Sequence, residues 1–169
     1  MQTDLDSLAL TVVIALDGHT VATAESITGG AVGATITSIP GASKSFRGGV
    51  VAYASDLKSS ILGVPEQLIE SGGAVQAEVA LAMATGVANK LDAEFGLALT
   101  GVAGPDWQDG VAPGTVFVAC VMRDADGSVI DSAVEELHIT PMVEDPRQIR
   151  SEIREESVAA ALELLLTFL

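Results

Sequence analysis

Apolar residues recur along the chain with two different spacings, and the changes between them predict the order of helices and strands. From Leu5 to Leu16 they recur every three or four positions, which is typical of one face of an α-helix. Asp4 is a suitable N-cap for this helix, and Gly18 ends the run. Further helices are predicted over residues 28–38, 56–62 and 77–90, from Pro65 as a first helical residue, and from Ile149 to Phe168.

Short apolar runs between these helices predict buried strands over residues 20–24, 48–54, 95–99, 114–121 and 129–137. The last two surround residues 124–127, which end in Asp-Gly, a strong signal for a hairpin turn. Strands that alternate with helices indicate an α/β fold. We expect a three-layer α/β/α sandwich with a mixed, mostly parallel sheet and helices on both faces. No linker divides the chain, so residues 1–169 are predicted to form a single domain.

Charge narrows the possible partners. The chain has 23 acidic residues against 8 basic ones, a formal net charge of -15. Such a field repels phosphate backbones and anionic lipid surfaces, so we expect neither nucleic acid nor a membrane as a partner. An anionic small molecule would need a local site built from the few cationic side chains. Aromatic residues make up only 4% of the chain, so aliphatic side chains must fill the core.

The location of the protein is predicted from three features. The only cysteine, Cys120, sits in an apolar run and reads as a buried apolar group. The first residues lack the basic region of a secretory signal. Residues 26–43 carry no charge over the length of a membrane span, but their glycines, proline and hydroxyls are unsuited to one. We therefore expect a soluble, cytoplasmic protein.

Unusual residues follow three of the predicted strands, where α/β sheets bind ligands. After the first strand comes Ser26, then Thr28, Gly29 and Gly30. The serine is either the N-cap of the next helix or a nucleophile facing a crevice. Free amides of residues 28–30 at a helix start are able to stabilise an oxyanion or hold a phosphate.

Tyr53 and Lys58 follow the second strand. A lysine at such a position is commonly a solvated surface residue. Beside a serine nucleophile, however, an unprotonated lysine serves as the base without any histidine. The tyrosine would then orient the lysine or carry a proton to the leaving group.

The loop after the third strand, from Thr100 through Gly101 to Gly104, is a weak phosphate-binding signal, and its glycines also suit an ordinary turn. Trp107 in the same loop would either stack on an aromatic ring or cover an edge of the sheet. Arg147 and Arg150, near the start of the last helix, either bind an anionic group or pair with neighbouring carboxylates.

Metal chemistry is not predicted. His19 and His138 lie outside the three strand-end motifs, and no spacing typical of zinc or other metal ligands is present. We therefore expect neither a metal nor a cofactor.

Taken together, these motifs resemble the C-terminal domain of the competence/damage-inducible CinA family, which includes stand-alone nicotinamide-nucleotide amidohydrolases (NMN deamidases). The resemblance runs over nearly the whole chain. It rests on "TAESITGG", "FRGGVVAYASDLK", "LGVPEQLIESGGAVQAEVALAMATG", "ALTGVAGP", "PGTVFVA" and "ESVAAALELL", in this order and spacing.

The resemblance implies an α/β/α fold and hydrolysis of the carboxamide of nicotinamide mononucleotide (NMN) to nicotinic acid mononucleotide and ammonia. The nucleophilic serine of the family matches Ser26, and its tyrosine and lysine match Tyr53 and Lys58. Its threonine matches Thr100, and an arginine matches Arg147 in a divergent context. We also expect a homo-oligomer. Two other hypotheses remain, a non-catalytic pyridine-nucleotide-binding module and an amidase for another small amide.

The chain departs from the family pattern at three places. The cysteine that commonly follows the serine is Ile27, and the asparagine that many members have two residues beyond the tyrosine is Ser55. A glycine-rich stretch with a lysine is replaced by residues 106–112. Because that loop is expected to shape the pocket, the substrate is predicted less firmly than the fold.

Overall fold

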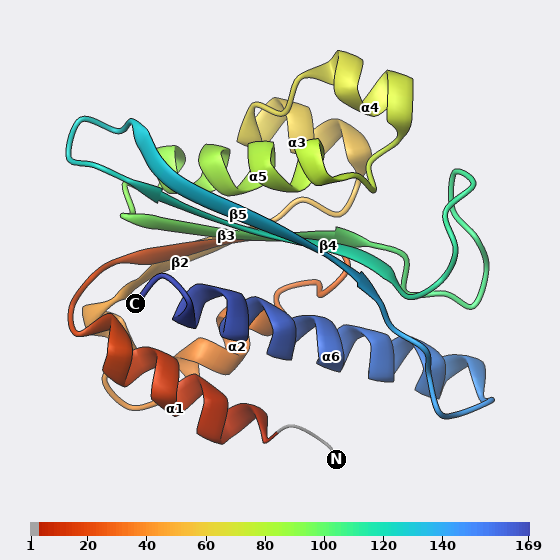
Figure 1. The fold of residues 1–169 in the computed structure, drawn as a ribbon, viewed down its shortest axis with the longest axis horizontal. Helices are drawn as coiled ribbons and strands as arrows, with labels where there is room; N and C mark the ends of the chain where they lie inside the picture. The colour runs from red at the N-terminus through yellow and green to blue at the C-terminus, as the bar shows by residue number, and fades with distance from the viewer. Residues whose placement is uncertain (1–3) are drawn as a thin grey trace.

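The computed structural model describes residues 4–169, which form a five-stranded sheet between two layers of helices (Figure 1). The strands are β1 (Val21–Glu25), β2 (Phe46–Val51), β3 (Phe95–Gly101), β4 (Thr115–Arg123) and β5 (Val129–His138). Their order in space is β2-β1-β3-β4-β5. β1 is parallel to β2 and β3, whereas β4 is antiparallel to β3 and β5. The α/β/α sandwich, with a mixed sheet and a parallel core, is confirmed.

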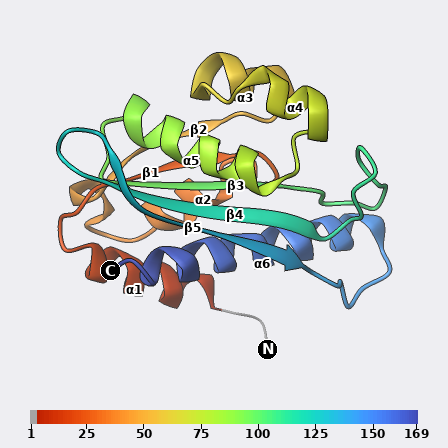
Figure 2. The same ribbon diagram turned by 45° about the horizontal axis from the view of Figure 1, so that its top comes forward.

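The helices divide between the two faces of the sheet (Figure 1 and Figure 2). α1 (Leu5–Leu16), α2 (Ala31–Thr37) and α6 (Pro146–Leu166) cover one face, and α3 (Ser55–Leu62), α4 (Glu66–Gly72) and α5 (Ala77–Lys90) lie on the other. A short 3-10 turn (Ala42–Lys44) precedes β2. In β1 the side chains alternate between the layers, Val21 packing with the first, and Ala22 and Ala24 with the second.

Most predicted boundaries agree with the structure to within a few residues. α5 has the predicted bounds, and α1 is capped by Asp4, whose carboxylate accepts two backbone N–H groups of the first turn. β2 ends at Val51 instead of residue 54, because the neighbouring strand β1 ends at Glu25, which lies opposite Val51. Pro65 is the N-cap of α4 and not its first helical residue. α2 begins at Ala31 instead of residue 28, for a reason that lies in the candidate site.

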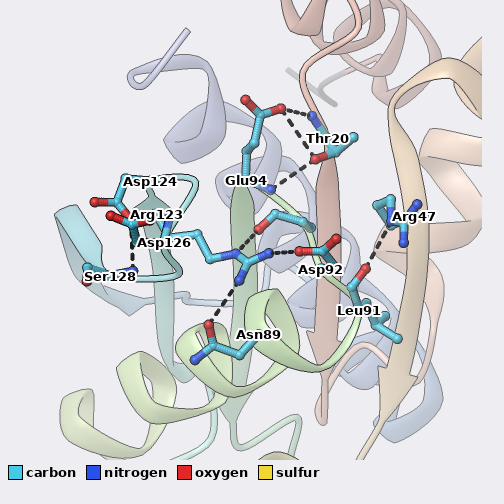
Figure 3. A network of polar contacts seen from close by, with 11 residues as sticks. Thr20, Arg47, Asn89, Leu91, Asp92, Glu94, Arg123, Asp124, Asp126 and Ser128 are labelled. Atoms are coloured by element: carbon cyan, nitrogen blue, oxygen red, sulfur yellow. Dashed lines mark hydrogen bonds and ion pairs between the residues drawn. The ribbon is translucent and has the colours of Figure 1, made fainter.

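A polar network joins the turns at the amino ends of β1 and β3 (Figure 3). The Glu94 carboxylate accepts hydrogen bonds from the backbone N–H and the hydroxyl of Thr20, and the Thr20 hydroxyl accepts one from the N–H of Glu94 at 3.0 Å. At the end of β4, the Arg123 guanidinium donates to the carbonyl of Ala93 and pairs with Asp92. These contacts align β1, β3 and β4 at one end of the sheet.

The sheet buries Cys120 completely in β4, as the sequence predicts. Burial raises the pKa of its thiol to about 12. The uncharged residues 26–43 form the loop after β1, the helix α2 and the turn that follows it. Within residues 4–169, no helix has the length and the apolar character that crossing a bilayer requires.

Candidate functional site

A cleft of about 110 Å³ lies where the carboxyl ends of the three parallel strands meet. The cleft is lined by the segments that follow β1, β2 and β3, by the helices α3 and α6, and by the loop that precedes α5. They contribute Ser26, Ile27, Tyr53, Lys58, Ala74, Val75, Thr100, Gly101, Ala103, Gln108 and Arg150. The three strand ends singled out in the sequence thus lie around one cleft.

Ser26 follows directly after β1 and is 8% exposed. Its N–H donates to the carbonyl of Leu99 at 3.2 Å, which holds the residue beside β3. The N-cap of α2 is Gly30, with φ 101, a left-handed conformation that favours glycine. Ser26 is therefore not the N-cap of α2, and it lines the cleft instead.

The residue before the serine, Glu25, organises the turn that carries it. Its carboxylate is 1% exposed and accepts hydrogen bonds from the hydroxyl of Thr28 at 2.6 Å and from three backbone N–H groups. These belong to Gly30 at 3.1 Å, Val32 at 3.0 Å and Gly33 at 2.8 Å. The carboxylate binds the N–H groups of Val32 and Gly33, which a helix begun at residue 28 would bond to its own carbonyls, so α2 starts at residue 31.

The backbone amides expected to form an oxyanion hole differ in their availability. The N–H of Gly29 donates to the carbonyl of Ser26 at 3.1 Å, and that of Gly30 is bound by the carboxylate. The N–H groups of Ile27 and Thr28 make no backbone hydrogen bond within residues 4–169. Of these two residues, Ile27 lines the cleft, whereas Thr28 is fully buried and does not.

Lys58, in the first half of α3, is 1% exposed. Its Nζ atom donates to the carbonyl oxygens of Ala52 at 2.9 Å and Tyr53 at 3.1 Å. No carboxylate forms an ion pair with it among the described residues. Burial lowers the pKa of Lys58, and the charge of Asp56 opposes this shift in part. A buried amine with a lowered pKa is a candidate base.

Two more expected residues line the cleft in different ways. The side chain of Tyr53 is 62% exposed at its mouth. Thr100 is buried, and its hydroxyl donates to the carbonyl of Ala74 at 2.7 Å, which ties the end of β3 to the loop before α5. Thr100 therefore shapes the wall while its oxygen keeps the capacity to accept a further hydrogen bond.

The two arginines near the start of α6 have different positions. Arg150 lines the cleft, and its Nη1 atom donates to the carbonyl of Gly104 at 2.5 Å. Arg147 is exposed in the first turn of α6 and does not line the cleft. Neither forms an ion pair with a carboxylate among the described residues. Both are exposed, and of the two only Arg150 lines the cleft.

Sequence patterns did not identify Gln108 as a lining residue. It belongs to the loop after β3, which lies beside the start of α6 (Figure 2). Reciprocal backbone hydrogen bonds with Val111, at 3.1 and 2.8 Å, close a tight turn over Asp109 and Gly110. The Asp-Gly pair was the available signal for this turn, but it does not indicate that the glutamine faces the cleft.

Comparison with known protein families gives one consistent match. The family model of the CinA C-terminal domain matches residues 6–169. A CinA-like protein of Frankia casuarinae is 49% identical over 113 residues, which are 67% of this chain and 26% of that protein. A putative competence-damage inducible protein of Halalkalibacterium halodurans is 46% identical over 113 residues, 67% of this chain and 27% of that protein. The chain thus spans about a quarter of the length of these relatives.

Solved structures extend the likeness to nearly the whole chain. A competence/damage inducible protein from Agrobacterium tumefaciens superposes with a TM-score of 0.85 and 34% identity, over 97% of this chain and 94% of that one. A CinA superfamily protein from Escherichia coli superposes with a TM-score of 0.83 and 30% identity, over 98% and 90% of the two chains.

Proposed function

Because the chain belongs to the CinA C-terminal-domain family, which the match over residues 6–169 shows, we propose that it hydrolyses the carboxamide of NMN. The products are nicotinic acid mononucleotide and ammonia. The observation that carries this proposal is the buried Lys58, with its lowered pKa, in the same cleft as Ser26. A serine next to an unprotonated amine is the pair that amide hydrolysis needs when no histidine is present.

In the proposed reaction the Ser26 oxygen attacks the amide carbon while the neutral amine of Lys58 takes the hydroxyl proton. The tetrahedral intermediate collapses when the amide nitrogen takes a proton from Lys58, directly or through Tyr53, and leaves as ammonia. Water then attacks the acyl-serine ester and releases the carboxylic acid and the free serine. The carbonyls of Ala52 and Tyr53, which bind Nζ, would hold the amine in place during both transfers.

The oxyanion of the intermediate requires hydrogen-bond donors close to the serine. The N–H group of Ile27, which lines the cleft, is proposed for this role, since the amides of Gly29 and Gly30 are already bound. One such donor is worth about 3–4 kcal/mol in the transition state.

The phosphate of NMN requires a local cation, because the net charge of -15 repels it elsewhere. Arg150 is proposed for this role in place of Arg147, since only Arg150 lines the cleft. Gly101 and the neighbouring Thr100 form the adjoining wall, where the ribose would lie. The proposal thus assigns the nucleotide to the side of the cleft formed by β3 and α6.

One observation favours a second candidate function, hydrolysis of a different small amide. Residues 106–112 depart from the family pattern, and the loop places the uncharged Gln108 at the cleft. A glutamine amide binds hydroxyl or amide groups and adds no charge for a phosphate. A substrate without phosphate would suit this side chain.

The decisive experiment incubates the purified protein with NMN, nicotinamide riboside and a panel of small amides, and measures ammonia together with the acid product. Release of both from NMN, lost in the Ser26→Ala variant, supports the first proposal. Turnover of another amide alone supports the second. Calorimetric binding of NMN without any ammonia would instead indicate a nucleotide-binding module. A homo-oligomer and a cytoplasmic location stay predictions, which sedimentation and cell fractionation test.

A further inference from the structure

A second cavity, of about 210 Å³, lies between α2 and the part of the sheet formed by β1 and β2. It shares no lining residue with the cleft. Thr23 and Glu25 of β1 line it from the sheet, Gly33 lines it from α2, and Gly49 and Phe46 line it from β2. Nothing in the reaction proposed above uses this cavity.

Thr23 has an unmet hydrogen-bonding requirement. The residue is 0% exposed, and its Oγ1 atom is the one buried side-chain nitrogen or oxygen atom of the described residues that has no hydrogen-bond partner. Buried hydroxyls are normally hydrogen-bonded, because leaving one without a partner destabilises the fold. A group from outside the chain would provide the missing partner.

Glu25 adds a negative charge on the same side of β1, two residues further along. All four of its hydrogen-bond donors are neutral, and no Lys, Arg or His side chain forms an ion pair with it within residues 4–169. Oε2 accepts three of the four bonds, and Oε1 accepts only the one from Gly33 at 2.8 Å. Oε1 therefore keeps a lone pair for a further donor or cation.

Glycines keep open the space that these two oxygen atoms share. A Cβ atom at Gly33 would lie 3.1 Å from Cζ of Phe46, 3.5 Å from Oε1 of Glu25 and 3.6 Å from Oγ1 of Thr23, so one small group there reaches both oxygen atoms and touches the edge of the Phe46 ring. A Cβ atom at Gly49 would overlap the Thr23 hydroxyl. Larger residues at these two positions would fill the place next to the oxygen atoms.

We propose that this cavity binds a singly charged cation, of the size of ammonium or potassium, between the Thr23 hydroxyl and the Glu25 carboxylate. One carboxylate and one neutral oxygen suit a single positive charge. No group of three or more His, Cys, Asp or Glu side chains that could hold a metal ion occurs in the described part of the chain. The net charge of -15 raises the local concentration of small cations. The proposal does not depend on the identity of the substrate.

Occupancy of the site would affect the turn that carries Ser26, because the same carboxylate holds Thr28 and Gly30. A cation at Oε1 neutralises this buried charge and favours the folded arrangement of the turn. Bound cation and thermal stability are therefore linked.

The test is thermal unfolding of the full chain in ammonium, potassium and tetramethylammonium chloride at equal ionic strength. We expect the Tm to rise with the logarithm of the ammonium or potassium concentration. No such rise is expected in tetramethylammonium, whose methyl groups keep its charge away from the two oxygen atoms and leave it no N–H donor. A response to only one of the two small cations supports the proposal and identifies the ion. Equal responses to all three salts would reflect screening and overturn it.

Three variants locate the effect. Thr23→Val removes the hydroxyl and Gly33→Ala fills the space, so both should abolish the specific rise in Tm. Thr35→Val is the matched control, since the Thr35 hydroxyl bonds to Ala31 in α2 outside the cavity. An unchanged rise in Thr23→Val and Gly33→Ala would overturn the site. In the wild type, amide chemical shifts of Gly30, Val32 and Gly33 provide a second measurement, and their failure to respond to the cation also contradicts the proposal.

Discussion

The amine of Lys58 donates to the backbone carbonyl of Tyr53 at 3.1 Å, while the side chain of Tyr53 stands at the mouth of the same cleft. The turn between β2 and α3 therefore carries Tyr53, and its backbone carbonyls fix the place of the Lys58 amine, which extends from α3. A change in this turn would move the proposed base and the proposed proton carrier together.

Replacing Ser26 with alanine should abolish hydrolysis and change the free energy of unfolding by no more than about 1 kcal/mol, because the side chain is not a helix cap. Ammonia release and urea unfolding, measured on one preparation, check this. Ser60→Ala, on the exposed surface of α3, is the matched control and should keep full activity. Near-normal turnover by Ser26→Ala would exclude the serine as nucleophile.

The pH dependence of kcat/KM should reflect the lowered pKa of Lys58. Burial favours the neutral amine, so activity should rise with pH through an apparent pKa below the ordinary value of about 10.4. Lys58→Arg keeps the charge but stays protonated, and Lys58→Met keeps the length without an ionisable group. Both should lose activity by roughly 100-fold or more. An active Lys58→Arg enzyme would leave the lysine only an electrostatic role.

Arg150 should discriminate between substrates with and without a phosphate. Arg150→Ala should weaken transition-state binding of NMN by about 1.5–3 kcal/mol, the scale of a charge-assisted hydrogen bond, and hardly affect nicotinamide riboside. Arg147→Ala, three residues earlier in α6 and outside the cleft, is the control. Values of kcat/KM for both substrates decide the outcome. A larger loss in Arg147→Ala than in Arg150→Ala would reverse the assignment.

Glu25→Gln should loosen the turn that carries Ser26. The glutamine NH2 group would meet backbone N–H donors where the carboxylate now accepts hydrogen bonds, which should cost about 1–3 kcal/mol of stability and reduce kcat. The measurements are urea unfolding and steady-state kinetics. Glu66→Gln, exposed in the first turn of α4, should change neither. If both variants behave alike, the buried carboxylate does not hold the turn.

Gly86→Ala should push α3 away from α5. A Cβ atom at Gly86 would overlap the carbonyl oxygen of Leu62 at the end of α3, the helix that carries Lys58. We expect a loss of about 1–3 kcal/mol in stability and a fall in activity, since the amine moves with its helix. Thr85→Ala, at the neighbouring position of α5, is the control. Unfolding curves and ammonia release measure both effects, and an unaltered stability would show that α3 shifts without strain.

Local patterns were sufficient for most of the architecture. α1 and α5 have apolar faces at helical spacing, and Asp4 has the side chain that a cap requires, so their bounds follow from the sequence. Ser26, Tyr53 and Thr100 could be grouped because they follow neighbouring parallel strands, whose carboxyl ends share one edge of the sheet.

The remainder of the site depends on contacts between distant segments. The late start of α2 follows from the way in which the Glu25 carboxylate is buried, which no local propensity encodes. The choice between Arg147 and Arg150 depends on how α6 is rotated against the loop that contains Gly104. The position of Gln108 depends on an irregular turn. In each case the position of the residue depends on a contact with another part of the chain or on the tertiary arrangement, which local sequence patterns do not reveal.

The polar network around Thr20, Glu94 and Arg123 (Figure 3) joins the amino ends of β1 and β3, whereas the cleft lies at the carboxyl ends of these strands. The contacts that align the strands therefore share no residue with the loops that would meet a substrate. Loops at the cleft are free to vary without disturbing that alignment. For protein engineering, the domain is a scaffold onto which loops with other binding preferences can be grafted.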